Sequence, residues 1–261
     1  MSKKASREAY LLNLLNSTSR ISVSEVVEMF NVSEATARRM FSELEKSGKF
    51  VRNYGGIQLA GQLPDYSFEI REKSFKQEKL RIGTLAASFV EDADTIYLDC
   101  GTTLFQMTLA LSARISNQEF NSLTIFTNSI ANVQAIAPSP QCRVVLVGGE
   151  YNYKRRDFSG PLTEKYVAPF HFTKCFLGAD GLNDKMGFSS NQFDISSLNS
   201  CVMSHSDYTY VLLDSSKFDR CSLVSYSPLE SVGAIVTNAA PSEALIASLA
   251  ANDIQIHIAN E

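Results

Sequence analysis

From residue 76 onward, short apolar runs alternate with segments of helical spacing, and this alternation limits the possible fold more than any other feature. The runs are rich in Val, Ile, Leu and Tyr, which favour strands. They lie at 95–99, 123–127, 143–147, 174–178, 208–214, 233–237 and 254–258, between helical segments at 76–90, 103–113, 129–137, 161–168, 192–206 and 241–250. Strands that are apolar on both faces and separated by helices predict a buried, mostly parallel sheet covered on both sides, a Rossmann-like α/β fold.

Residues 1–48 have a different pattern, with clear signals for the starts and ends of helices. Apolar residues within 10–15 form the stripe of a first helix. Ser22 and Glu25 match the capping box S-x-x-E, which opens a second, short helix. Residues 31–32 then predict a tight turn.

A third helix follows this turn. Ser33 is placed to N-cap it, Gly48 to end it by a glycine C-cap, and its inner face is expected to be Ala37, Phe41 and Leu44. Beyond it, KFVRNYGGIQLA at 49–60 alternates around Gly55-Gly56 and predicts a small hairpin. Two helices joined by a turn and followed by a hairpin predict a winged helix-turn-helix.

The exposed face of the third helix is suited to reading DNA. Small hydroxyls and arginines there are what a reader of the major groove needs, because arginine bonds guanine bidentately or pairs with phosphate. The simpler interpretation is an amphipathic helix with two solvated arginines, but the capped helix, turn and wing together favour DNA binding. The predicted contacts from helix and wing tip are Ser33, Thr36, Arg38, Arg39, Arg52, Asn53 and Tyr54.

The charge is unevenly distributed between the two parts of the chain. Residues 1–60 hold nine Lys and Arg and six Glu, a net charge of +3, whereas the other 201 residues sum to −7. A basic module joined to an acidic body is expected when one domain meets phosphates and the other does not. Residues 60–75 contain Gly, Pro and mixed charge without a period and are predicted to be a linker. The expected domains are therefore 1–59, for DNA binding, and 76–261.

Glycines and polar residues follow several predicted strands of the second domain. LDCGTT at 98–103 puts an acid, a glycine and two hydroxyls at a helix start, where free amides and the helix dipole favour a phosphate. Similar clusters stand after four other strands, at 127–129, 148–149, 178–181 and 214–218, the last of which contains Lys217. Since ligands of such folds bind at the carboxyl ends of the strands, a phosphate site is predicted there.

At the N-terminus the sequence resembles the DeoR family of bacterial repressors. The resemblance is carried by Val32-Ser33, by the Thr-x-Arg-Arg segment at 36–39, by Leu-Glu-x-x-Gly at 44–48 and by Arg-x-x-Gly-Gly at 52–56. It implies double-stranded operator DNA as a partner.

The strand-end clusters of the second domain also resemble this family, so the resemblance covers almost the whole chain. It implies a sheet domain similar to sugar-phosphate isomerases, which binds a phosphorylated sugar or polyol as effector and releases a repressor of carbohydrate use from its operator. The effector contacts that it implies are Asp99, Gly101, Thr102, Thr103, Thr127, Asn128, Gly148, Gly149, Gly178, Asp180, Gly181 and Lys217.

Three residues depart from the family pattern. Met40 stands where the family usually has Asp after the arginine pair, which removes an expected partner of one arginine. Phe193 and Asn199 stand where many members carry Glu and Lys. The effector pocket is therefore expected to differ in its specificity or affinity.

Two functions other than that of a repressor are compatible with the predicted fold. A sugar-phosphate isomerase needs a base near the substrate carbon, for which Asp99 and Asp180 are available, whereas the three histidines are expected to be structural. An enzyme, however, has no use for the basic N-terminal residues, so no catalytic residue is predicted. The third alternative is a DNA-binding protein whose second domain only forms oligomers.

Composition sets further expectations. The five cysteines are scattered and form no CxxC, so neither disulfides nor a metal site is predicted, and no motif indicates a cofactor. No apolar run approaches the roughly 18 residues of a membrane span, and the N-terminal run does not have the length of a signal-peptide core. A cytoplasmic protein is expected, and operator symmetry favours a dimer or tetramer.

Overall fold

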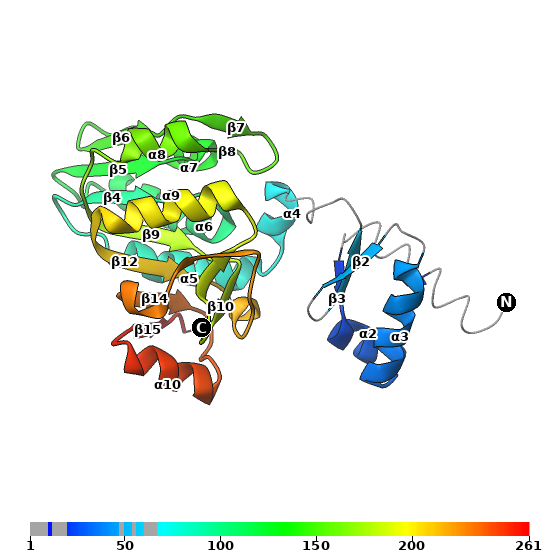
Figure 1. The fold of residues 1–261 in the computed structure, drawn as a ribbon. Coiled ribbons are helices and arrows are strands. Elements are labelled where there is room, and N and C mark those ends of the chain that lie inside the picture. Colours follow the sequence, from blue (N-terminus) through cyan, green and yellow to red (C-terminus); the bar gives the residue numbers. More distant parts are fainter. Residues whose placement is uncertain (1–9, 12–19, 47–49, 54–55, 60–66, 261) are drawn as a thin grey trace. The chain divides into compact units, whose positions relative to one another are not determined.

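A computed structural model describes residues 10–11, 20–46, 50–53, 56–59 and 67–260. The chain divides into two compact units, Met1–Tyr66 and Ser67–Glu261. Each unit has its own hydrophobic core, and Figure 1 shows the elements of both. Among the described residues, no helix has both the length and the apolar character to cross a membrane.

In the first unit, the start of helix α2 (Val23–Phe30) is set by the predicted capping box. The backbone N–H of Glu25 donates to Ser22 Oγ at 3.2 Å, and the backbone N–H of Ser22 donates to Glu25 Oε2 at 2.6 Å. The helix ends at Asn31, which adopts a left-handed conformation with φ 47°, and this confirms the predicted turn. Because asparagine tolerates that conformation better than most residues, the local sequence accounts for the helix and its end.

Helix α3 (Glu34–Glu45) follows the turn and is capped as predicted, with the backbone N–H of Thr36 donating to Ser33 Oγ. Its buried face includes the expected Ala37, Phe41 and Leu44, and also Met40. Met40 therefore packs in the core of the unit, where the charge of an aspartate would be buried at high cost. The predicted C-cap, Gly48, lies outside the described residues.

A three-stranded sheet completes the described part of this unit, with the order β1 (Arg20–Ser22), β3 (Gly56–Leu59), β2 (Phe50–Asn53). Asn53 pairs with Gly56, so the predicted hairpin is confirmed, but Gly56, which was expected in the turn together with Gly55, belongs to β3. Residues 54–55 lie outside the described part. A Cβ on Gly56 would lie 2.6 Å from the carbonyl oxygen of Ile21. The close approach of β1 thus requires a glycine at this position.

The second unit is built on a seven-stranded sheet in which all neighbouring strands run parallel, as the alternating pattern predicts. Its order is β15 (Gln255–Ile258), β14 (Ala234–Thr237), β12 (Ser206–Leu212), β9 (Phe172–Gly178), β4 (Thr95–Leu98), β5 (Leu123–Thr127), β6 (Cys142–Leu146). The carboxyl ends of β4, β9 and β12 are therefore neighbours at one edge of the sheet.

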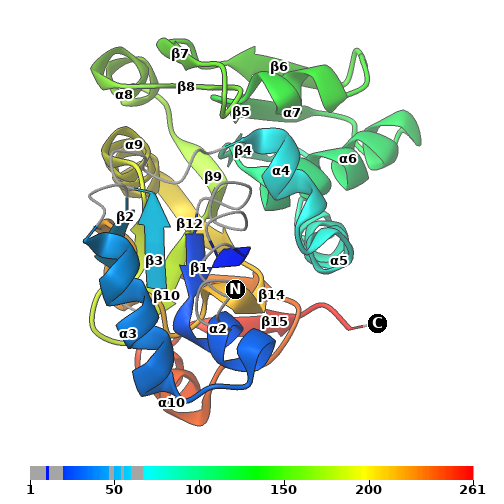
Figure 2. The same ribbon diagram turned by 90° about the vertical axis from the view of Figure 1, so that its right-hand side faces the viewer.

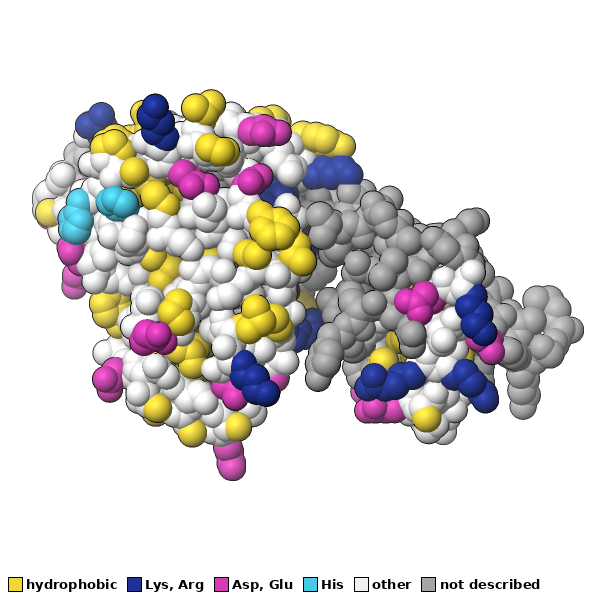
Figure 3. Space-filling view, viewed as in Figure 1, with side chains coloured by type: hydrophobic (Ala, Val, Ile, Leu, Met, Phe, Trp, Pro, Cys, Tyr) yellow, Lys and Arg dark blue, Asp and Glu magenta, His cyan; other side chains and the backbone are white. Residues whose placement is uncertain are grey.

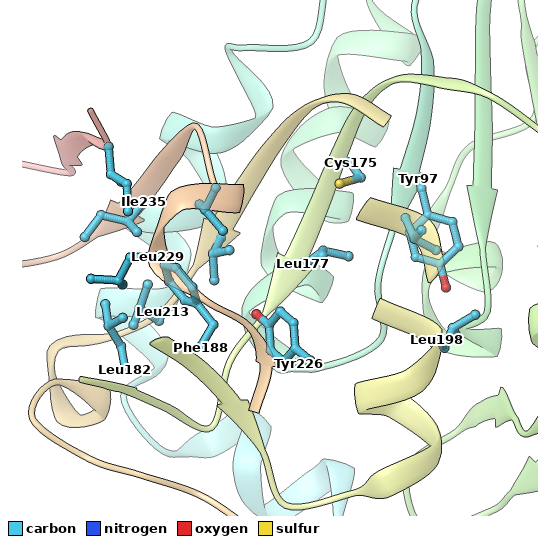
Figure 4. Close-up of a cluster of buried hydrophobic side chains, with 14 of the residues drawn as sticks. Tyr97, Cys175, Leu177, Leu182, Phe188, Leu198, Leu213, Tyr226, Leu229 and Ile235 are labelled. Atoms are coloured by element: carbon cyan, nitrogen blue, oxygen red, sulfur yellow. The ribbon is translucent and has the colours of Figure 1, made fainter. Parts of the chain in front are cut away.

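Helices cover both faces of this sheet, and the strand residues alternate between them. Ile96 and Leu98 pack in a core with α5 (Lys76–Ala87) and α6 (Thr102–Ser116), next to α7 (Ile130–Ala135). Tyr97 points to the other face, into a core with α8 (Pro161–Val167), α9 (Phe193–Ser204) and α10 (Glu243–Ala251). Figure 2 shows α5 and α9 on opposite sides of the sheet, and Figure 4 shows part of the second core.

Several short elements are not predicted by the hydrophobic pattern. They are the hairpin β7 (Glu150–Asn152) and β8 (Asp157–Ser159), the small antiparallel sheet β10 (Gly181–Asn183), β11 (Gly187–Ser190) and β13 (Val224–Ser227), and the short helices η1 (Ser215–Lys217) and η2 (Leu229–Ser231). These segments are three or four residues long, too short for a period to be recognised.

The predicted linker at 60–75 is wrong in its second half. Helix α4 (Phe68–Lys73) lies within it, and Phe68 is buried against Phe105 with ring centroids 5.4 Å apart. Ser67 onward therefore belongs to the second compact unit. A six-residue helix anchored by one aromatic side chain has no repeating apolar pattern, which is why the sequence reads as irregular.

Candidate functional site

The predicted DNA-reading residues of α3 lie mostly at its surface. Ser33, Arg38 and Arg39 are exposed and Thr36 is half-buried. Arg38 forms an ion pair with Glu34, with 3.3 Å between Nη2 and Oε2, whereas Arg39 has no hydrogen-bond or ion-pair partner in the described part of the chain. Figure 3 shows Lys and Arg side chains on the described surface of this unit. Arg39 is therefore the arginine of α3 that can bind a partner without first losing an internal contact.

The remaining predicted contacts belong to the wing. Arg52 and Asn53 are the last two residues of β2, next to the hairpin turn, and Tyr54 lies outside the described residues. The backbone thus places Arg52 and Asn53 at the tip of the hairpin, as the sequence predicts.

In the second unit, Asp99 stands at the end of β4 and holds the neighbouring strand end in place. Its Oδ1 accepts a hydrogen bond from the backbone N–H of Cys100 at 2.7 Å, and its Oδ2 accepts one from that of Gly178 at 3.1 Å. Asn199, on α9, donates to the same Oδ2 at 3.4 Å. Asp99 therefore links the ends of β4 and β9 to α9.

Gly101 begins α6 with φ 115°, a backbone conformation that side chains with a Cβ rarely adopt. A Cβ at this position would meet nothing within 4 Å, and no side chain caps the helix. The hydroxyls of Thr102 and Thr103 have no hydrogen-bond partner among the described residues, although both side chains are buried. Amides of the first turn, two hydroxyls and open space thus coincide here, as a phosphate requires.

Burial raises the pKa of Asp99 to about 6, against the lowering effect of its backbone hydrogen bonds and of Arg155. The folded protein consequently retains a proton on this carboxyl at a pH where the unfolded chain, with an ordinary value of 3.8, has released it.

This raised pKa predicts a dependence of stability on pH. Relative to Asp99→Asn, the free energy of unfolding of the wild type should fall as pH rises from about 4 to about 6 and then level off, because the folded state binds one more proton only in that window. Chemical unfolding followed by circular dichroism at several pH values measures the difference.

The control for this measurement is Asp92→Asn. The pKa of exposed Asp92 is lowered to about 2 by hydrogen bonds from Asn121 and Ser122. The corresponding change should therefore lie below pH 4 and have the opposite sign. A difference between wild type and Asp99→Asn that is constant from pH 4 to 6 would contradict the burial of a charged Asp99.

Two positively charged side chains, Arg71 and Lys217, act on Asp180, which follows β9. Arg71 Nη1 lies 2.7 Å from Asp180 Oδ1, and the backbone N–H of Asn191 donates to Oδ2 at 3.0 Å. Although burial raises the pKa of Asp180, the positive charges of Arg71 and Lys217 hold it down at about 2. Lys79, on α5, donates to the carbonyl oxygens of Arg71 and Ser74 at 2.6 and 2.7 Å.

Lys217 is half-buried in this group and, within the described residues, its ammonium group has no hydrogen-bond or ion-pair partner. Burial and the charge of Arg71 lower its pKa, and the attraction of Asp180 opposes them. Burial likewise lowers the pKa of Lys79 to about 8. With their electrostatic partners, Lys79 and Lys217 form a group of four cations, which include Arg71 and Arg220, and three carboxylates, Glu78, Asp180 and Asp214. One positive charge is thus in excess for an anion.

The other predicted effector residues have different surroundings. Thr127 is fully buried, and its hydroxyl accepts hydrogen bonds from the backbone N–H of Ser129 and from Asn132 Nδ2. Gly148 and Gly149 line a hollow of about 490 Å³ with residues of α8. Gly181 is required by packing, since a Cβ there would lie 2.7 Å from the carbonyl oxygen of Arg220. The structure therefore groups Gly101–Thr103, Asp180 and Lys217 at three adjacent strand ends, whereas Gly148 and Gly149 lie apart from them, after β6.

Buried oxygen atoms without hydrogen-bond partners among the described residues surround the Asp99–Cys100 segment. Asn132 Nδ2 donates to the carbonyl oxygen of Asp99 and Asn199 Nδ2 to its carboxylate, while the amide oxygens of both are unpaired. Arg155 donates to Asp157 at 2.8 Å and contacts Cys100 Sγ at 3.3 Å. The unpaired amide and carboxylate oxygens are Asn128 Oδ1, Asn132 Oδ1, Asp157 Oδ1 and Asn199 Oδ1. All are acceptors, so groups that donate hydrogen bonds fit them.

Arg71, Lys79, Asn132 and Arg155 belong to these clusters and were not predicted from the sequence. Of these, only Lys79 could have been recognised from the sequence. It lies on the same face of α5 as Ile82, Gly83 and Ala86, and a charged residue on a buried helix face is unusual. Phe193, which departs from the family pattern, is exposed at the start of α9, whereas Asn199 lies within the site. In the part of the chain that the structure describes, no group of His, Cys, Asp and Glu could hold a metal ion.

Comparison with known families matches both units. Residues 7–62 match the model of the DeoR-like helix-turn-helix domain, and residues 74–239 match that of the DeoR C terminal sensor domain. The lactose phosphotransferase system repressor of Staphylococcus epidermidis is 30% identical over 234 residues, which cover 87% of this chain and 89% of that protein.

Two further relatives are regulators of similar length. The transcriptional repressor AccR of Agrobacterium fabrum is 30% identical, with 89% of this chain and 88% of that protein covered. The regulator IolR of Bacillus subtilis is 27% identical, with 88% of each covered. Among solved structures, ribose 5-phosphate isomerase A of Methanocaldococcus jannaschii aligns with 56% of this chain and 55% of that one, at 18% identity and a TM-score of 0.41.

Proposed function

The chain belongs to the DeoR family of helix-turn-helix transcriptional regulators, and we propose that it represses genes of carbohydrate use until a phosphorylated sugar or polyol releases it from its operator. The DNA contacts are Ser33, Thr36, Arg38 and Arg39 of α3 with Arg52, Asn53 and Tyr54 of the wing. The effector lies at the carboxyl edge of the parallel sheet. A symmetric operator needs two recognition helices, so the active form is a homo-oligomer, and it acts in the cytoplasm, where the operator is.

The observation that carries the effector proposal is the unpartnered Lys217. A half-buried ammonium group without a hydrogen-bond partner is unfavourable in the free protein, and a bound anion removes this penalty. Thr102 and Thr103, with the free amides of α6, supply hydrogen bonds to phosphate oxygens at the same edge of the sheet. A phosphate group fits this set of donors better than a carboxylate, because it offers three oxygens.

The unpaired oxygens around Asp99 support the proposal that the ligand contains a sugar or polyol. Asn128, Asn132, Asp157 and Asn199 each present a buried acceptor, and sugar hydroxyls are donors. These atoms are buried, so a ligand reaches them only if the loops at the carboxyl edge of the sheet move. A ligand with a phosphate at one end and several hydroxyls along its length satisfies both clusters.

Phosphorylated sugars and polyols should therefore bind, and their unphosphorylated parents should not. In thermal unfolding of the full-length protein, an effector at a hundred times its Kd raises the stability by about 2.7 kcal/mol, and the parent compound leaves it unchanged. The same effector should release the protein from a DNA fragment that the protein selects from a random pool. Analysis of the recovered ligand for isomers tests the alternative of an isomerase, which Asp99, with its pKa of about 6, favours.

Equal stabilisation by the phosphorylated and parent compounds would contradict the phosphate site. Stabilisation without release from DNA would contradict the regulatory role and favour an enzyme. If no compound of either class binds, the second unit serves oligomerisation alone.

A further inference from the structure

The helix α4 contacts the proposed phosphate site from two sides. Phe68 packs on Phe105, in the first turn of α6, and its backbone N–H donates to the carbonyl oxygen of Lys154 at 2.9 Å. One turn later, Arg71 pairs with Asp180 at the end of β9. In the chain, α4 is the first described element after the unit that contains the helix-turn-helix. It therefore joins the ligand site, in sequence, to the DNA-binding unit.

An incoming anion can compete with Asp180 for Arg71. The ion pair between these two residues is partly open to solvent, with side chains 31% and 17% exposed, so the anion can reach it. Asp180 Oδ2 is already bound to the backbone N–H of Asn191, which fixes the carboxylate, whereas the arginine is on a helix of only six residues. An exchange is therefore expected to move the Arg71 side chain rather than the carboxylate.

The positive charge beside Arg71 favours an exchange of partners. Lys217 and Lys79 both lie close enough to interact electrostatically with Arg71, and Lys217 has no partner of its own in the described chain. A phosphate monoester carries close to two negative charges and accepts two parallel hydrogen bonds from a guanidinium group. It therefore binds Lys217 and Arg71 together more strongly than the singly charged Asp180 can hold Arg71.

We propose that Arg71 is an anion ligand of the sensor site, and that it exchanges Asp180 for the phosphate group of the effector and thereby displaces α4. This rests on the proposed function, since it takes the effector to be phosphorylated. Lys79 takes part because it holds the carbonyl oxygens of Arg71 and Ser74, so a shift of the arginine is passed to the end of α4. The ligand thus acts on the segment that leads to the DNA-binding unit.

A double-mutant cycle with inorganic phosphate as the probe tests the exchange in the full-length protein. Arg71→Gln should weaken phosphate binding about tenfold, as loss of a hydrogen bond to a charged group does. Asp180→Asn should strengthen it about two- to fivefold, because the competing carboxylate is gone. In the Arg71→Gln background the gain from Asp180→Asn should be clearly smaller, since part of it acts through Arg71. Calorimetry measures all four proteins.

The matched control is Arg156→Gln. The Arg156 guanidinium lies 5.4 Å from the Phe68 ring, beside α4, but it bonds Gln134 and does not contact Asp180. Its phosphate affinity should equal that of the wild type. As a second readout, hydrogen exchange of peptides that cover residues 67–74 should change on addition of phosphate in the wild type and in Arg156→Gln, but not in Arg71→Gln.

If the ion pair is only structural, Arg71→Gln and Asp180→Asn should both weaken phosphate binding. This result would overturn the exchange. An equal gain from Asp180→Asn with and without Arg71 would do the same. In either case the wild type still binds phosphate, so the proposed function stands. If the wild type binds neither inorganic phosphate nor any phosphorylated sugar, the proposed function and this inference fail together.

Discussion

Arg39→Ala should abolish binding to the specific operator while leaving the fold and the effector response intact. Arg39 is exposed on α3 and has no partner in the described chain, so its removal leaves no buried group unpaired. Loss of a bidentate contact to a base costs about 1 to 3 kcal/mol, roughly 5- to 150-fold for each recognition helix. Two helices on one symmetric operator multiply this factor. A mobility-shift assay with the DNA fragment selected by the wild type measures the loss.

Two controls separate a lost base contact from a lost charge. Arg143→Ala removes an exposed arginine of the sheet domain and should bind the operator like the wild type. Binding of Arg39→Ala to DNA of random sequence should change little and keep its steep dependence on salt, because the other basic residues still contact phosphates. Unchanged operator affinity in Arg39→Ala would show that α3 does not read the bases through this residue.

Lys217→Ala should produce a repressor that no longer responds to its effector. The ammonium group of Lys217 has no hydrogen-bond or ion-pair partner among the described residues, and burial together with Arg71 lowers its pKa. The free protein therefore loses no hydrogen bond when the side chain is shortened. The bound effector loses a hydrogen bond between charged groups, worth about 1.5 to 3 kcal/mol, or roughly 10- to 150-fold in affinity. Operator binding without ligand should stay normal, and calorimetry with the phosphorylated and parent sugars measures the change.

The control for this variant is Lys185→Ala, an exposed lysine on the turn between β10 and β11, which should not change effector binding. Thr102→Val removes one proposed phosphate donor while keeping the shape of the side chain, and it should weaken the phosphorylated ligand as well. If Lys217→Ala lowers the affinity for phosphorylated and parent sugars equally, Lys217 does not bind the phosphate. If it lowers the melting temperature of the free protein, its role is structural.

The local sequence was enough to predict the helix-turn-helix. Ser22 and Glu25 form the capping box, Asn31 takes the left-handed turn and Ser33 caps α3, each through groups within three residues of one another. Interactions of this range depend on the order of residues alone. The same holds for the strands of the large sheet, whose apolar runs were predicted with bounds close to those observed.

The candidate site could be predicted only in part. Asp99, Gly101, Thr102 and Thr103 stand next to one another in the chain, so their cluster at the start of α6 was visible as a motif. Thr127 had the same appearance after its own strand, yet its hydroxyl is used inside the protein by Ser129 and Asn132. A motif after a strand predicts the position of a residue in the backbone. The partners of its side chain depend on the loops that pack over that position.

The sequence by itself determined that this chain has a helix-turn-helix and a parallel sheet with glycines and hydroxyls after its strands, because local caps and hydrophobic periods specify both. Only the tertiary structure decided the order of the strands, which makes the ends of β4, β9 and β12 neighbours. It alone brought Arg71 from a supposed linker to Asp180, 109 residues away in the chain. The physical reason is that a pattern identifies a strand or helix, whereas its neighbours depend on how all the apolar faces are buried together.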